Sequence, residues 1–199
     1  MGRYTKIPKS TFDAIQLDAG VLLYNFDLEA ASASAGAAGY TDEDFICATT
    51  GGIEAECAAE YSDLAEDVDN APNNMKEFLH LDGWTCTLGF TSLTNDVKGL
   101  RLSLGAADID GNKVTPRRDV KQSDFRDVWW VGDKANGGFL AIHLMNALSS
   151  EGFSLKTEKA GKGQVETTLT GYVSIDEQDV VPMEFYSIDG EEESGEESE

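Results

Sequence analysis

The sequence predicts a mainly β fold: an antiparallel β-sandwich or barrel with one flanking α-helix, an extended N-terminal arm and long loops. Residues 84–91 support this prediction, because apolar and polar side chains alternate there with the period of a half-buried strand. Residues 164–175 alternate in the same way. Residues 125–131 are rich in the aromatic and β-branched side chains that favour strands. Many strands around one helix are typical of a sandwich or barrel.

The predicted helix covers residues from about 94 to 104. Thr94 is the expected N-cap, and Gly105 supplies the C-terminal stop. Gly99 inside the helix costs up to about 1 kcal/mol relative to alanine, so packing must hold the helix in place. The apolar residues that recur at helical spacing are Leu93, Val97, Leu100 and Leu104.

Residues 139–148 are apolar at both odd and even positions, which fits either a helix or a strand buried on both faces. We favour the strand, because residues 149–152 resemble a hairpin turn that leads into a second strand at 153–157. A strand buried on both faces needs a second surface to cover it.

The length of 199 residues indicates one domain with appendages. We expect an N-terminal arm at residues 1–20, a folded domain at 21–187 and a disordered acidic tail at 188–199. Inside the domain, residues 30–39 are a low-complexity run of Ala, Ser and Gly and predict a flexible loop. The carboxylate-rich residues 53–74 predict a solvated acidic loop.

The charge balance excludes several classes of function. The chain has 15 Lys and Arg against 37 Asp and Glu, a net charge of -22. Such a chain is unsuited to wrapping nucleic acid or docking on an anionic membrane, because both need clustered cations. No apolar run approaches the roughly 20 residues that span a bilayer. The N-terminus has no apolar stretch of a signal peptide, so we expect synthesis in a cytoplasm.

The sequence gives little support for an enzyme, and we predict no catalytic, cofactor-binding or metal-binding residue. It has no nucleophile elbow, phosphate-binding loop or zinc-type spacing. Cys47 or Cys57 could pair with a histidine as a nucleophile, but three cysteines without a local signature fit reduced core thiols better. His143 lies in the most apolar segment and is expected in a core or an interface.

Residues 108–112 begin like a calcium-binding loop. Lys113 occupies the sixth position, where an EF-hand needs glycine, and Asp119 replaces the twelfth-position glutamate. We therefore favour a polar turn that leads into Pro116.

A series of short segments between residues 45 and 186 forms a further pattern. In order, the segments are 49–53 (TTGGI), 67–77 (DVDNAPNNMKE), 81–84 (LDGW), 105–110 (GAADID), 113–117 (KVTPR), 127–133 (DVWWVGD), 138–153 and 179–186 (DVVPMEFY). Together they resemble the major tail protein family of long-tailed siphophages, whose members form the tail tube. The Ala/Ser-rich residues 30–39 and the glutamate tail depart from the family pattern.

The resemblance implies a structural virion protein of two packed sheets, a flanking helix, arms and loops, a fold similar to the tube proteins of contractile tails and type VI secretion systems. Six subunits would form a ring with a continuous inner β-barrel, and rings would stack into a hollow tube around a tape-measure protein. Tail terminator and tail-tip proteins would be further partners. DNA would pass through as cargo and not bind as a ligand, and no membrane is implied. The tube would assemble in the host cytoplasm and function in the virion.

Within this hypothesis two groups of residues have expected roles. We expect subunit contacts from the strand at 139–148 and ring-to-ring contacts from the acidic segment 53–74. The candidate interface residues are Phe139, Ile142, His143, Met145, Pro72 and Met75. The candidate lumen residues are Glu166, Thr168 and Thr170, on the polar face of the strand at 164–174. The strands flanking residues 84–91 are an alternative lumen wall, and ordinary solvent exposure explains such polar faces equally well.

Carboxylates on the lumen wall would repel the phosphates of DNA within a Debye length of about 8 Å. DNA would then slide without sticking to the wall.

The alternative function is a monomeric carbohydrate-binding β-sandwich. Trp129, Trp130 and Tyr172 are the aromatic residues that could stack on sugars. Such aromatics more often anchor a core or an interface.

Overall fold

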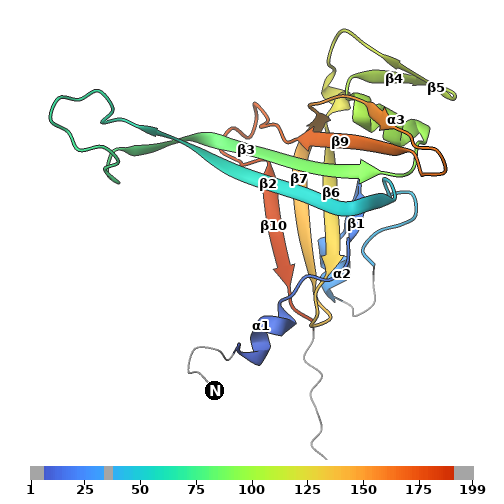
Figure 1. The fold of residues 1–199 in the computed structure, drawn as a ribbon, viewed down its shortest axis with the longest axis horizontal. Coiled ribbons are helices and arrows are strands. Elements are labelled where there is room, and N and C mark those ends of the chain that lie inside the picture. The colour runs from blue at the N-terminus through green and yellow to red at the C-terminus, as the bar shows by residue number, and fades with distance from the viewer. Residues whose placement is uncertain (1–6, 34–37, 191–199) are drawn as a thin grey trace, which may run out of the picture.

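The computed structural model describes residues 7–33 and 38–190 (Figure 1). The protein is mainly β, with 44% strand and 12% helix, and the predicted antiparallel β-sandwich with a flanking helix is confirmed. Residues 1–6 of the predicted arm and 191–199 of the predicted disordered tail lie outside the described residues. The described part of the arm returns to the body, where the Leu17 N–H donates to the carbonyl of Asp133.

Ten strands and three α-helices make up the described chain. The strands are β1 (Val21–Leu23), β2 (Thr49–Asp63), β3 (Leu79–Ser92), β4 (Ala107–Asp110), β5 (Lys113–Pro116), β6 (Arg126–Asp133), β7 (Phe139–Ser149), β8 (Ser154–Lys156), β9 (Gln164–Thr170) and β10 (Met183–Ile188). The helices are α1 (Lys9–Asp13), α2 (Leu28–Ala33), α3 (Val97–Leu104) and the 3-10 turn η1 (Gln122–Asp124).

The strands form two crossed layers (Figure 1). The larger sheet has the order β1-β6-β7-β9-β3-β2, with β10 paired to β7 and β8 paired to β9. Its two halves join where the end of β7 pairs with the end of β9, at Leu148 opposite Thr170. The layer of β2, β3, β9 and β8 therefore crosses the layer of β1, β6, β7 and β10, and β4 and β5 form a separate hairpin.

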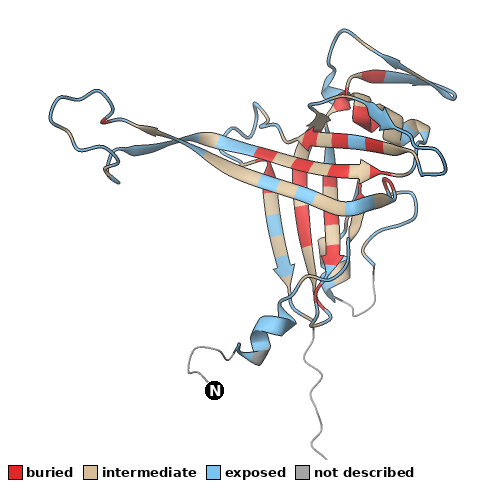
Figure 2. Ribbon diagram, in the orientation of Figure 1, coloured by how far each residue is buried: buried red, intermediate tan, exposed pale blue. Residues whose placement is uncertain are grey.

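The core fills the space between these layers, and Figure 2 shows the buried residues gathered where the layers cross. The predicted alternation in β3 and β9 is confirmed, because one side of each strand faces the core. Its buried residues are Cys86, Leu88 and Phe90 on β3 and Val165, Thr167 and Leu169 on β9. The alternation stops earlier than predicted: β9 ends at Thr170, and Val173 and Ile175 are exposed.

Residues 139–148 form a strand, as predicted, but the surface that covers the second face comes from the same chain. Phe26 packs edge-on against Phe139, with ring centroids 5.8 Å apart, and also contacts Trp129 at 5.6 Å. Trp129 stacks on His143 at 3.9 Å. These contacts cover the Phe139 end of the second face of β7 from within the chain, whereas His143 and Met145 further along are half-buried.

Several local predictions are wrong. The segment after residue 152 does not form a hairpin with β7, because β8 pairs with β9. The helix starts at Val97 and not near residue 94, because the Asp96 carboxylate accepts from the Gly99 N–H at 2.7 Å and caps the helix. Helix α2 occupies residues 28–33, where we expected the start of a flexible loop. Strand β10 also carries the fold to Ile188, one residue into the predicted tail.

The predicted acidic loop at 53–74 is wrong over its first half. Residues 53–63 belong to β2, which pairs with β3 in a hairpin that extends far beyond the body (Figure 1). Gly51 and Gly52, with φ of 78° and 80°, form a bulge where β2 begins. A second register shift follows Glu60. We call the hairpin from Ala59 to Trp84 the arm; from here on this name does not refer to the N-terminal arm predicted at residues 1–20.

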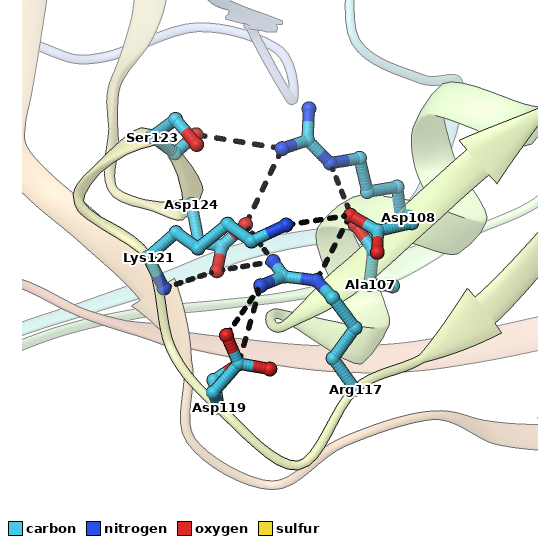
Figure 3. Close-up of polar contacts among 8 residues, drawn as sticks. Ala107, Asp108, Arg117, Asp119, Lys121, Ser123 and Asp124 are labelled. Carbon is cyan, nitrogen blue, oxygen red and sulfur yellow. Dashed lines mark hydrogen bonds and ion pairs between the residues drawn. The ribbon is translucent and has the colours of Figure 1, made fainter.

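A network of charged side chains fixes the β4–β5 hairpin to the body (Figure 3). Asp108, from the segment that resembles a calcium loop, pairs with Arg117 Nε at 3.0 Å and Lys121 Nζ at 3.3 Å. Arg101 of α3 donates to the carbonyl of Ala107 at 3.3 Å. Asp110 lies opposite Lys113 in the β4–β5 pair, so residues 111–112 form the polar turn favoured above, and the second strand ends at Pro116.

Candidate functional site: the two sides of the β2–β3 hairpin

The outer face of the layer of β2, β3 and β9 is a continuous surface of carboxylates and threonines. Strand pairing aligns the residues in rows across the three strands. The rows are Thr50, Thr91 and Glu166; Glu54, Gly89 and Thr168; and Glu56, Thr87 and Thr170. All are exposed or half-buried, and their neighbours along each strand face the core. We call this surface the acidic face, and it includes Glu60 and Thr85 at the base of the arm.

The glutamates of the acidic face carry their charge without a cation. Among the ion pairs of the described residues, none includes Glu54, Glu56, Glu60 or Glu166. Glu60 accepts a hydrogen bond from the Thr85 hydroxyl at 2.6 Å. An uncompensated row of carboxylates repels polyanions and remains hydrated.

The predicted lumen residues Glu166, Thr168 and Thr170 all lie on the acidic face. Sequence reasoning missed the contribution of β2, namely Glu54, Glu56 and Glu60. The available signal was their alternation with Ala55, Cys57 and Ala59, whose side chains face inward.

The opposite side of the hairpin is apolar, and it stays apolar where the arm leaves the body. Trp84 lies opposite Ala59, and Tyr61 lies opposite Leu81, so these side chains continue the core-facing side of the sheet. Trp84 is 40% exposed, Leu81 43% and Tyr61 56%. Further exposed apolar residues follow toward the tip: Leu64, Val68, Phe78 and Leu79. Rows of exposed apolar side chains of this kind are typical of interaction surfaces.

The edges of this layer are also open. Among the described strands, β2 pairs with β3 alone, so its 15 residues present one unpaired backbone edge. At the other end of the layer, β8 pairs with β9 alone. Long open edges are templates for pairing with another chain.

The predicted interface residues are not brought together. Ile142 is 6% exposed and belongs to the core, which leaves little of its side chain accessible to another molecule. Phe139 and Met145 are half-buried in β7. Pro72 and Met75 lie far from these residues in the tip of the arm, Pro72 exposed and Met75 half-buried.

His143 is held in place by its own chain. Its Nε2 lies 3.4 Å from Asp127, and its Nδ1 lies 3.4 Å from Glu184. The bond from His143 holds the pKa of Asp127 below its ordinary value, against an opposing effect of burial and with help from the Asn146 N–H. This cluster joins β6, β7 and β10, and we regard it as structural.

The aromatic residues of the carbohydrate alternative do not form a common platform. Trp130 is buried in the core, where its indole N–H donates to the carbonyl of Ala19 at 2.9 Å. Trp129 is stacked between His143 and Tyr186. Tyr172 is the exposed member of the three, and Phe125 packs against it edge-on.

Within residues 7–33 and 38–190, no group of three or more His, Cys, Asp or Glu side chains is arranged to hold a metal ion. The helices of this part of the chain are too short or too polar to cross a lipid bilayer. A surface cavity of about 380 Å³ lies between α3 and β6. Part of its charged lining is engaged, because Arg101 contacts Asp124 and Asp44 accepts from Thr41 and Asn25. The lining also includes Glu43, Lys98 and Arg126.

No protein-family model matches the chain, and no curated protein matches it in sequence.

Proposed function

We propose that the protein is the subunit of a self-assembling hollow tube, a phage tail tube that delivers DNA to the host. The observation that carries this proposal is the two-sided β2–β3 hairpin. One side is an acidic face without paired cations, and the other is an apolar arm that projects beyond the body. In a monomer, the apolar side of the arm and the unpaired edge of β2 would both remain exposed to solvent.

The two open edges of the layer support a ring. Because β2 and β8 are different strands, a contact between them is heterologous: the β2 edge of one copy meets the β8 end of the next. Heterologous contacts either close into a ring or continue as a filament. Closure would join the layers of successive copies into one barrel, with the acidic face on its inner wall.

The apolar arm supports the stacking of rings. It extends away from the sheet and presents Tyr61, Leu81 and Trp84 to a neighbour. Each large apolar side chain that becomes fully buried contributes about 1.5–3 kcal/mol. A few such side chains in each copy, repeated around a ring, suffice for a stable stack.

The acidic inner wall would serve the passage of DNA, which moves as cargo. The same hypothesis names a tape-measure protein inside the tube and terminator and tip proteins at its ends. The proposed tube would assemble in the host cytoplasm and function in the virion.

Negative-stain electron microscopy of the purified protein over a range of concentrations, with light scattering, tests this function. We expect rings or hollow tubes. The variant Tyr61→Ser/Leu81→Ser should form shorter tubes or single rings, because it removes the apolar side of the arm. His80→Ser changes an exposed residue on the other side of the arm and should assemble normally. Monomers that persist even with a tail-tip initiator complex would contradict the proposal. Sugar binding would then be the function to test.

A further inference from the structure

Two of the three cysteines face each other across the hairpin. Cys57 on β2 lies directly opposite Cys86 on β3, and their Sγ atoms are 3.2 Å apart. Residues directly opposite in an antiparallel pair have Cα atoms about 4.5–5.5 Å apart, which lies inside the range that a disulfide can bridge. Both cysteines are free thiols in this structure, and Cys47 is free as well.

The position of the pair gives a bond there a structural effect. Cys86 is completely buried in the core, and the next inward-facing pair along the hairpin is Ala59 and Trp84, where the arm begins. The two cysteines are 29 positions apart in the sequence, so a bond between them would close a loop that contains the whole arm.

We propose that Cys57 and Cys86 are a redox-sensitive pair that a small-molecule disulfide, such as oxidised glutathione, converts into a cross-strand disulfide at the base of the arm. Cys57 lies on the edge strand and is partly exposed, so its thiolate attacks one sulfur of oxidised glutathione and releases one glutathione thiolate. The Cys86 thiolate then attacks the Cys57 sulfur and releases the second glutathione. Two protein thiols lose two electrons and two protons, and one glutathione disulfide becomes two thiols.

This chemistry does not depend on assembly, although it suits the proposed function. A cytoplasm keeps such a pair reduced, whereas the surroundings of a released particle are oxidising. The bond would form after release and hold the base of the arm closed. Cys47 is not part of the pair, because it is buried beside Ser92 and belongs to another part of the core.

The test uses the full-length protein incubated with oxidised glutathione or with reduced glutathione, then acid-quenched, denatured and alkylated. We expect free thiols to fall from three to one, and the intact mass to fall by two hydrogen atoms before alkylation. Trypsin cuts after Lys76, which separates Cys57 from Cys86. A glutamate-specific protease cuts after Glu54 and Glu56, so Cys47 and Cys57 also lie on separate peptides. The oxidised sample should contain a peptide that begins at Cys57 linked to the peptide that contains Cys86.

Single cysteine variants identify which two thiols form the bond. Cys47→Ser should still lose two thiols on oxidation, whereas Cys57→Ser and Cys86→Ser should lose none to an internal bond. Wild-type protein that keeps three thiols, or that links Cys47 or two different chains, would overturn the proposal. Because the peptide map is made on the wild-type protein, the outcome does not depend on the folding of a variant or on tube formation.

Discussion

Arg117 Nη2 lies 2.5 and 2.6 Å from the two carboxylate oxygens of Asp124, whose side chain is completely buried. The Lys121 N–H donates to the same carboxylate at 2.8 Å, and Arg101 approaches it at 3.4 Å. The carboxylate therefore ties together α3, η1 and the segment that follows β5 (Figure 3). A buried charge with this many partners is costly to leave incomplete.

We predict that Asp124→Asn lowers the free energy of unfolding by about 3 kcal/mol, because it leaves Arg117 and Arg101 without their buried counter-charge. Urea denaturation followed by tryptophan fluorescence measures this loss. Asp119→Asn is the matched control: Asp119 also contacts Arg117, at 3.6 Å, but is largely exposed, so its loss should cost less than about 0.5 kcal/mol. Equal losses in the two variants would contradict the role of Asp124.

The stability of the protein should fall in acid, partly through Asp124. Burial acts to raise the pKa of Asp124, but the Lys121 N–H and the Arg117 guanidinium prevail and hold it below the ordinary value. A lowered folded-state pKa gives stability that is fully present above the unfolded-state pKa of about 3.9 and is lost as pH falls through the folded-state pKa.

Asp44, Asp127 and Asp189 also have lowered pKa values, so the wild-type curve alone does not isolate Asp124. The difference in urea midpoint between wild type and Asp124→Asn should be constant from pH 7 to 5 and shrink below about pH 4. Parallel curves down to the lowest pH at which both proteins fold would contradict the assignment.

The sequence predicted those strands whose two faces differ sharply. In the second half of β3 and in β9 every other residue is buried, and Leu88, Phe90 and Leu169 make the alternation strong. In β2 the inward residues Ala55, Cys57 and Ala59 are small, and the outward ones are glutamates. The pattern was therefore weak, and the glutamates suggested a loop.

The features that sequence reasoning predicted wrongly or missed depend mostly on contacts between segments that are distant in the sequence. The turn after β7 favoured a local hairpin, but β8 pairs with the later strand β9. Phe26 covers Phe139, at one end of β7, from a distant part of the sequence, which periodicity cannot reveal. The part of the acidic face on β9 was predicted through Glu166, Thr168 and Thr170. The apolar arm was missed because the register shift after Glu60 interrupts its pattern.

We predict that Gly138→Ala is far more damaging than Gly137→Ala. A Cβ at Gly138 would overlap the carbonyl oxygen of Ile188, so β10 would have to move. A Cβ at Gly137 meets no atom within 4 Å, but its φ of 79° costs an alanine about 1 kcal/mol. Thermal unfolding should show a loss of more than about 2 kcal/mol for Gly138→Ala. Similar melting temperatures would show that the end of β10 at Ile188 is not held against this turn.

The acidic face makes a prediction about DNA. If it lines the tube, Glu56→Lys places a cation on the wall in every subunit, and assembled tubes should retain short duplex DNA. This retention should weaken steeply with salt, as expected for phosphate contacts. Asp110→Lys makes the same charge change on the exposed β4–β5 hairpin and should retain no more DNA than the wild type. Filter binding over a salt series measures both. Equal retention by the two variants would place the acidic face outside the lumen.

Closure of the Cys57–Cys86 bond should become faster as pH rises. Burial, aided by the neighbouring Cys57, raises the pKa of Cys86 to about 12, so its thiolate is scarce near neutrality. Burial is the largest cause of this shift and remains once glutathione is attached to Cys57, although the contribution of the Cys57 thiol is lost. The rate of closure should therefore rise with pH between pH 7 and 9, by up to about tenfold per pH unit. Acid quenching and intact-mass measurement follow the loss of the glutathione adduct. In Cys86→Ser the adduct should persist at every pH. A rate in the wild type that does not change with pH would show that the Cys86 thiolate does not limit closure.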